Sequence, residues 1–154
     1  MRADEYVEQL KELDSKIDMY RDEERELWTL ATSMTANYSG MPSGSSDPDG
    51  MTGIVKKIID AQKRTNAKID EYVDAREDVV SHIGKLPHRQ CEVLHWLYVR
   101  KRKERKKNQS WYYTWSEVAD NMGCTEQNVG KLRGIAIRNL QKILDSEEKT
   151  KKVD

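Results

Sequence analysis

Two long stretches in the first half of the chain place apolar residues at alternating steps of four and three. The first runs from Tyr6 to Leu27 and the second from Ile54 to Ile83. This spacing keeps an apolar seam on one side of a helix that packs against a partner. Because each helix carries one apolar stripe and abundant charge elsewhere, neither is stable alone in water. We therefore predict that residues 1–83 form a long antiparallel, coiled-coil-like helical hairpin.

Residues 37–50 separate the two stretches and concentrate Gly, Pro, Ser and Asp. This composition predicts a mobile loop that lets the two helices fold back on each other. The seam is imperfect, because Glu24, Thr65 and Arg76 occupy seam positions. The pattern fits pairing within one chain and pairing between chains in a homo-oligomer equally well. The helices are expected to serve as a spacer or dimerisation arm, or as a surface for another protein such as RNA polymerase.

The second half contains the signals of three further helices. Residues 86–99 have a compact apolar face and Pro87 in the first turn, where its missing N–H does no harm. Thr114 and Glu117 have the spacing of a capping box, which predicts a helix start. Gly123 is placed to end that helix in a left-handed conformation, and Thr125 can cap the next one. Two helices joined by a short turn that contains Gly predict a helix-turn-helix.

In a helix-turn-helix the outward residues near the start of the second helix face the major groove of DNA. Gln and Asn side chains can pair with adenine and Arg with guanine, whereas Lys chiefly neutralises phosphate. The candidate base contacts are Glu126, Gln127, Asn128 and Lys131. Further along the same helix, Arg133 and Arg138 are candidate phosphate contacts.

A basic insertion at residues 100–113 separates the first of these helices from the helix-turn-helix. Each phosphate that such a segment neutralises releases counterions and strengthens binding in a salt-dependent way. Its aromatic residues Trp111, Tyr112 and Tyr113 either support the segment or stack on an exposed base. The candidate phosphate contacts in it are Arg100, Lys101, Arg102, Lys103, Arg105, Lys106 and Lys107.

The amino-acid composition agrees with a helical protein that binds a polyanion. Of the 154 residues, 35% are charged and 36% are hydrophobic, with 8 Gly, 3 Pro and no Phe, which favours an all-α fold over strands and turns. Residues 1–81 carry 11 basic and 18 acidic side chains, and residues 82–154 carry 16 and 9, so the halves have net charges of −7 and +7. This asymmetry indicates a basic part that binds nucleic acid.

Other kinds of site are not indicated. The two cysteines, Cys91 and Cys124, form no Cys-x-x-Cys pair, and His82, His88 and His95 lack metal-ligand spacing, so neither a metal site nor a disulfide is expected. No phosphate loop or catalytic motif is present, so we expect no enzyme activity and no cofactor. No apolar run approaches the ~20 residues that span a bilayer, and the start of the chain does not resemble an export signal, so a cytoplasmic protein without a membrane partner is expected.

The second half resembles region 4 of sigma-70-type factors, the four-helix domain that reads the −35 promoter element. The resemblance covers about residues 84–144 and rests on Leu86-Pro87-x-Arg89-x-x-x-Val93-Leu94, on Trp115-Ser116-Glu117-Val118-Ala119-x-x-Met122-Gly123-Cys124-Thr125-x-x-x-Val129 and on Ala136-x-x-x-Leu140. In layout the chain is similar to small phage-encoded regulators of late transcription of the ArpU and RinA type. The resemblance implies that five residues lie against base edges or nearby phosphates, namely Glu126, Gln127, Asn128, Gly130 and Lys131. Gly130 and Glu126 depart from the family's pattern, so it implies no particular base sequence.

We therefore expect a non-enzymatic, sequence-specific regulator that binds double-stranded DNA and engages RNA polymerase. Its helix-turn-helix domain is expected over residues 84–146, followed by a disordered tail at 147–154. A small terminase-like DNA-packaging subunit is an alternative, and mass in solution distinguishes it, because a packaging ring needs many subunits. A second alternative is a module that binds only proteins through the helical hairpin.

Overall fold

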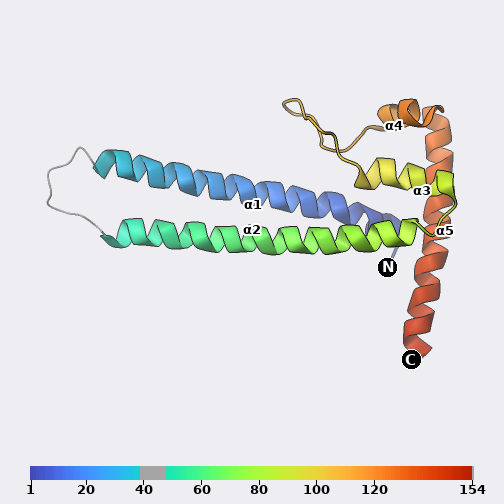
Figure 1. Ribbon diagram of the computed structural model, residues 1–154, viewed down its shortest axis with the longest axis horizontal. Helices are drawn as coiled ribbons and strands as arrows, with labels where there is room; N and C mark the ends of the chain where they lie inside the picture. Colours follow the sequence, from blue (N-terminus) through green and yellow to red (C-terminus); the bar gives the residue numbers. More distant parts are fainter. Residues whose placement is uncertain (39–47, 154) are drawn as a thin grey trace. The chain divides into compact units, whose positions relative to one another are not determined.

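The computed structural model describes residues 1–38 and 48–153, and its regular elements in these ranges are all helical (Figure 1). This confirms the prediction of an all-α fold. The loop predicted at 37–50 falls mostly on residues 39–47, which lie outside the described residues. In chain order the elements are α1 (Ala3–Tyr38), α2 (Pro48–Ile83), α3 (His88–Leu94), the π-helix η1 (His95–Val99), α4 (Trp115–Met122) and α5 (Glu126–Val153).

The chain divides into two compact units, and the division differs from the predicted boundary after residue 83. One unit is Glu12–Tyr72, here called the helix-pair unit. The other combines Met1–Lys11 with Val73–Asp154, here called the C-terminal unit. The apolar spacing of the two long helices continues without a break across the boundaries of the two units. The sequence pattern therefore does not show that residues 1–11 and 73–83 belong to the C-terminal unit.

In the helix-pair unit, α1 and α2 lie side by side and run in opposite directions (Figure 1). The seam residues that lie buried in this unit are Leu13, Ile17, Ile54, Ile58, Ala61 and Thr65. Thr65 satisfies its buried hydroxyl by donating to the carbonyl of Ala61 at 2.9 Å. A polar residue at this seam position is therefore accommodated by a local hydrogen bond.

An ion pair between Arg64 and Glu23 joins the two helices of this unit at the edge of the seam. A guanidinium nitrogen of Arg64 on α2 lies 2.5 Å from a carboxylate oxygen of Glu23 on α1. The same guanidinium lies over the ring of Tyr20, 4.7 Å from the centroid. Because both charged side chains are about half exposed, the pair contributes only ~0.2–1 kcal/mol, and the buried apolar seam holds the helices together.

The C-terminal unit has a core to which every one of its helices contributes. Tyr6 of α1 anchors the polar edge of this core, since its hydroxyl bonds to Asp78 and lies 2.9 Å from Nδ1 of His82, both on α2. Residues 1–11 and 73–83 therefore pack with the C-terminal helices. The completely or almost completely buried side chains include Val7, Leu10, Val79, Ile83, Leu94, Leu97, Val118, Val129 and Leu140.

The short helix predicted over residues 86–99 is α3 continued by η1. The backbone N–H of Arg100 donates to the carbonyl of His95 at 2.8 Å, the wide turn that defines a π-helix. The wider turn places Leu97, Tyr98 and Val99 in the core in succession. The chain then leaves the helix at Arg100, where the backbone becomes extended.

The predicted disordered tail at 147–154 is wrong for residues 147–153, because α5 continues to Val153. Glu147 supports this part of the helix, accepting a hydrogen bond from Nζ of Lys85 at 2.8 Å and lying 2.6 Å from Nε2 of His82. These partners precede Glu147 by 62 and 65 residues. A charged segment with no apolar stripe is typical of disorder when only the local sequence is considered.

Candidate nucleic-acid interface

Helix α4 begins and ends as its sequence predicts. The Thr114 hydroxyl accepts a hydrogen bond from the N–H of Glu117 at 3.2 Å, and the Glu117 carboxylate accepts one from the N–H of Thr114 at 3.1 Å, so the capping box is confirmed. Gly123 ends the helix with a φ of 68°. The N–H of Cys124 then donates to the carbonyl of Ala119 at 3.0 Å, which satisfies the open end of the helix.

The next helix follows directly from this turn. The Thr125 hydroxyl accepts a hydrogen bond from the N–H of Asn128 at 3.2 Å and thereby caps the start of α5. Val129 of α5 is completely buried, as is Val118 of α4, and Ala119 is nearly so. The small Ala119 side chain lets the two helices approach closely, and α4 and α5 are in contact.

The four candidate base contacts on α5 all lie on its solvent-exposed side. Glu126, Gln127, Asn128 and Lys131 are exposed, whereas Val129 between them faces the core. Gly123 ends α4 and Thr125 caps α5, so these two residues fix the position at which α5 and its exposed side begin. The resulting surface offers two side-chain amides and an ammonium group, which are suited to base edges and phosphates.

Trp115 has the helical spacing of the buried Val118 and Met122, but it is 45% exposed. Its ring lies against α5, where a Cβ built on Gly130 meets Trp115 Cζ3 at 3.3 Å. Gly130 therefore provides the space in which the indole packs. Glycine at this position departs from the pattern of sigma region 4, which residues 84–144 resemble. The packing of the Trp115 ring explains why a larger side chain is absent here.

The two arginines further along α5 differ in their surroundings. Nε of Arg133 donates to the hydroxyl of the buried Tyr98 at 2.6 Å, and its guanidinium lies 6.0 Å from the Trp115 ring centroid. Burial raises the pKa of Tyr98, and the hydrogen bond from Arg133 opposes this rise. Arg133 is thus half-buried and joins η1 to α5. Arg138 is exposed and donates to the carbonyl of Gly134 at 3.3 Å.

The basic insertion, residues 100–113, is here called the arm, and it folds back on itself. The N–H of Arg102 donates to the carbonyl of Trp111 at 2.8 Å, and Lys101 forms an antiparallel bridge with Tyr112. The chain reverses where the N–H of Gln109 donates to the carbonyl of Lys106 at 3.0 Å. Asn108 adopts a φ of 65° in this turn, a conformation that Asn tolerates better than most residues.

The prediction that Arg102 contacts a phosphate is wrong, because its side chain points into the protein. Both terminal nitrogens of its guanidinium pair with the Glu117 carboxylate, and its Nε donates to the carbonyl of Ser110 at 3.0 Å. Its side chain is only 9% exposed. The hydrogen bond from Arg102 lowers the pKa of the Glu117 carboxyl to about 2, with those from Thr114 adding to the effect.

The aromatic residues of the arm support its structure. Tyr112 is buried. Tyr113 packs edge-on against Trp96, with the ring centroids 5.2 Å apart. Trp111 is covered by the guanidinium of Arg105, 4.8 Å from the ring centroid. The first of the two roles expected for these rings, support of the arm, therefore agrees with their packing.

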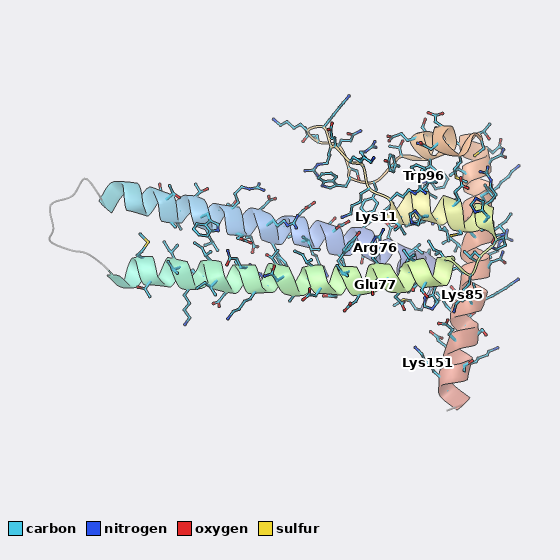
Figure 2. The ribbon with its side chains drawn as sticks, in the orientation of Figure 1. Lys11, Arg76, Glu77, Lys85, Trp96 and Lys151 are labelled. Atoms are coloured by element: carbon cyan, nitrogen blue, oxygen red, sulfur yellow. The ribbon has the colours of Figure 1, made fainter. Side chains whose placement is uncertain are left out.

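Arg100 at the base of the arm is packed on one side and exposed on the other. Its guanidinium lies 3.9 Å from the ring centroid of Trp96, which is labelled in Figure 2. Its Nε donates to Nδ1 of His95 at 2.9 Å. Burial lowers the pKa of His95, and the charges of Arg100 and Arg76 lower it further. His95 is therefore neutral near pH 7 and can accept this hydrogen bond.

The remaining cations of the arm lie at the surface. Lys103 and Lys106 are exposed on the way to the turn, and Lys107 is exposed within it. Lys101 and Arg105 are also exposed, although Arg105 lies over Trp111. The predicted phosphate contacts of the arm that reach solvent are Arg100, Lys101, Lys103, Arg105, Lys106 and Lys107.

Two basic residues outside the predicted set, Lys11 and Arg89, contact the arm or α4. Lys11 places its ammonium 4.8 Å from the ring centroid of Tyr98 and 5.3 Å from that of Tyr112, and burial lowers its pKa. Its position in the sequence gives no sign of these contacts, since both tyrosines lie in the other half of the chain. The guanidinium of Arg89 donates to the carbonyl of Met122 at 3.3 Å and so supports the end of α4.

Within residues 1–38 and 48–153, no three His, Cys, Asp or Glu side chains are grouped so that they could hold a metal ion. Among the helices of the same ranges, none has both the length and the apolar character that crossing a membrane requires. No family model, curated protein or solved structure matches the chain.

Proposed function

We propose that this protein is a transcriptional regulator that binds double-stranded DNA by placing the start of α5 in the major groove. The observation that carries the proposal is the turn between α4 and α5. Capping interactions fix both ends of α4 and the start of α5, and Gln127, Asn128 and Lys131 are exposed just after the turn. Two packed helices joined by a turn that contains Gly are typical of the helix-turn-helix.

The exposed residues of α5 suit a division between base reading and phosphate binding. A Gln or Asn amide can donate to N7 and accept from N6 of adenine at the same time, so Gln127 and Asn128 are the proposed base-reading residues. Lys131 and Arg138, about one and three turns further on, are proposed to neutralise phosphates. Glu126 is exposed at the same end of α5 and would disfavour a phosphate close to it, or accept from cytosine N4.

We propose RNA polymerase as the protein partner, in keeping with the resemblance of residues 84–144 to sigma region 4 and of the layout to phage late-transcription regulators. In this proposal the protein binds an upstream site and recruits polymerase through a helical surface. The opposite net charges of the two halves support the division of labour, because the basic half suits DNA and the acidic half is repelled by it.

Selection of bound duplexes from a randomised pool, followed by affinity measurements on the selected and on random duplexes, tests the DNA-binding proposal. Gln127→Ala is expected to weaken binding to the selected site by ~1–3 kcal/mol, about 5- to 150-fold, with a smaller loss on random DNA. The matched control is Gln62→Ala, at an exposed position of α2 in the helix-pair unit, which should change neither affinity. Failure to enrich any sequence, or equal losses on both duplexes, would contradict sequence reading by α5.

A further inference from the structure

A carboxylate in the first turn of α4 has two roles, one of which is to hold the arm. Glu117 completes the capping box with Thr114 and also receives both terminal nitrogens of Arg102. Because Arg102 additionally donates to the Ser110 carbonyl, it ties both sides of the arm to the first turn of α4. A planar guanidinium held at two points by a carboxylate fixes orientation as well as distance.

We propose that the arm is a wing that binds the phosphates of duplex DNA beside the segment contacted by α5, and that Arg102 is the residue that positions it. This inference rests on the proposed function, since it assumes that α4 and α5 dock on DNA. The wing supplies affinity that does not depend on base sequence, and α5 supplies the sequence preference.

The exposed chemistry of the arm favours phosphates over bases as its ligand. Its three aromatic rings are occupied by contacts within the protein, with Tyr112 buried, Tyr113 against Trp96 and Trp111 under Arg105. The exposed charged side chains around its turn are mostly cations, with the ammonium groups of Lys103, Lys106 and Lys107 and the guanidinium of Arg105 outnumbering the carboxylate of Glu104. Lysine acts on phosphate as a point charge and carries little base information.

The length of the arm allows it to reach a phosphate row that α5 does not cover. From Arg102 to Lys106 the chain spans four residue steps, which is at most about 13 Å, since the chain bends at Lys103 and Glu104. This reach is comparable to the ~12 Å width of the major groove, so a helix in the groove and a wing anchored beside it can contact different phosphates. A hydrogen bond between Arg102 and Trp111 closes the arm at its base, and one between Gln109 and Lys106 closes it at the turn.

The salt dependence of binding to a mixed-sequence duplex longer than two helical turns tests the wing. Each phosphate contact contributes about 0.9 to the slope of log affinity against log salt, so the triple variant Lys103→Gln, Lys106→Gln, Lys107→Gln is expected to lower the slope by up to about 2.7. The matched control replaces Lys149, Lys151 and Lys152 with Gln. It makes the same change in net charge on exposed lysines of the last part of α5, where Lys151 lies far from the arm (Figure 2). The control should keep nearly the wild-type slope.

The outcomes separate the wing from the proposed function. If the wild-type protein binds DNA and the triple variant keeps the wild-type slope, or loses no more than the control, the wing is refuted and docking by α5 stands. If the wild-type protein does not bind duplex DNA under any salt condition, the proposed function is refuted and the wing with it.

A double-mutant cycle tests the positioning role of Arg102. Glu117→Gln retains the capping-box pattern, in which Gln substitutes for Glu, but removes the charge that holds Arg102. If Arg102 positions the wing, the triple lysine variant will lose less affinity in the Glu117→Gln background than in the wild type, because an unanchored arm already contributes less. The same fold-loss in both backgrounds would show that the lysines act independently of the anchor. Circular dichroism verifies that each variant keeps the helical content of the wild type.

Discussion

Substituting Gly123, which ends α4 in the left-handed region, should destabilise the protein for a purely backbone reason. At a φ of 68° an L-residue with a Cβ costs roughly 1–2 kcal/mol relative to Gly. No heavy atom lies within 4 Å of a Cβ built on Gly123, so Gly123→Ala introduces no clash to confuse the result. A loss of this size corresponds to a Tm lower by about 2–8 °C for a chain of this length.

Gly134 provides the matched control, because it lies within α5 and likewise has nothing within 4 Å of a built Cβ. Gly134→Ala replaces a poor helix former with the best one and should stabilise the protein by up to ~1 kcal/mol. Urea unfolding followed by circular dichroism measures both variants against the wild type. If Gly123→Ala proves as stable as the wild type, or if both substitutions shift stability in the same direction, the reasoning about the turn is wrong.

Three further predictions concern the core, the pH dependence and the indole on α5. Leu140→Ala should lower the free energy of unfolding by ~2–5 kcal/mol because Leu140 is completely buried, whereas Leu30→Ala, at a half-exposed position, should change it by less than ~0.5 kcal/mol in urea unfolding. Hydrogen bonds from Lys85 and His82 lower the pKa of the Glu147 carboxyl to about 2, from 4.5, so the stability that Glu147 contributes is present above pH 4.5 and is lost as the pH falls toward 2. The stability difference between wild type and Glu147→Gln should therefore shrink over that interval, and a constant difference would contradict the pairing. Gly130→Ala should shift the tryptophan fluorescence spectrum, because the new methyl group meets the Trp115 ring at 3.3 Å, and an unchanged spectrum would indicate that the ring lies elsewhere.

The two ends of α4 and the start of α5 could be predicted because their signals are local. Thr114, Glu117 and Gly123 act on backbone groups within one turn of themselves, so their spacing is sufficient to place α4. Val129, Ala136 and Leu140 are buried as their periodicity indicates. The exposed side of α5 follows from the same periodicity, since the residues opposite a buried stripe face solvent.

The features that were missed depend on partners distant in the sequence or on the shape of a neighbour. Arg102 looks like one basic residue among several until Glu117, 15 residues later, is brought against it. The continuation of α5 beyond residue 146 was also missed, because Glu147 finds its partners in His82 and Lys85, more than 60 residues earlier. Trp115 has the periodicity of a core residue, but the missing side chain at Gly130 gives its ring a place on the surface of α5.

The central claim is that the start of α5 contacts DNA, and backbone amide chemical shifts recorded as duplex is added test it most directly. The account predicts that the largest shift changes fall on residues 126–131 of α5, with smaller changes at the tip of the arm. If the duplex shifted only residues of the helix-pair unit, or left α5 unchanged while binding was saturated, the account would be contradicted.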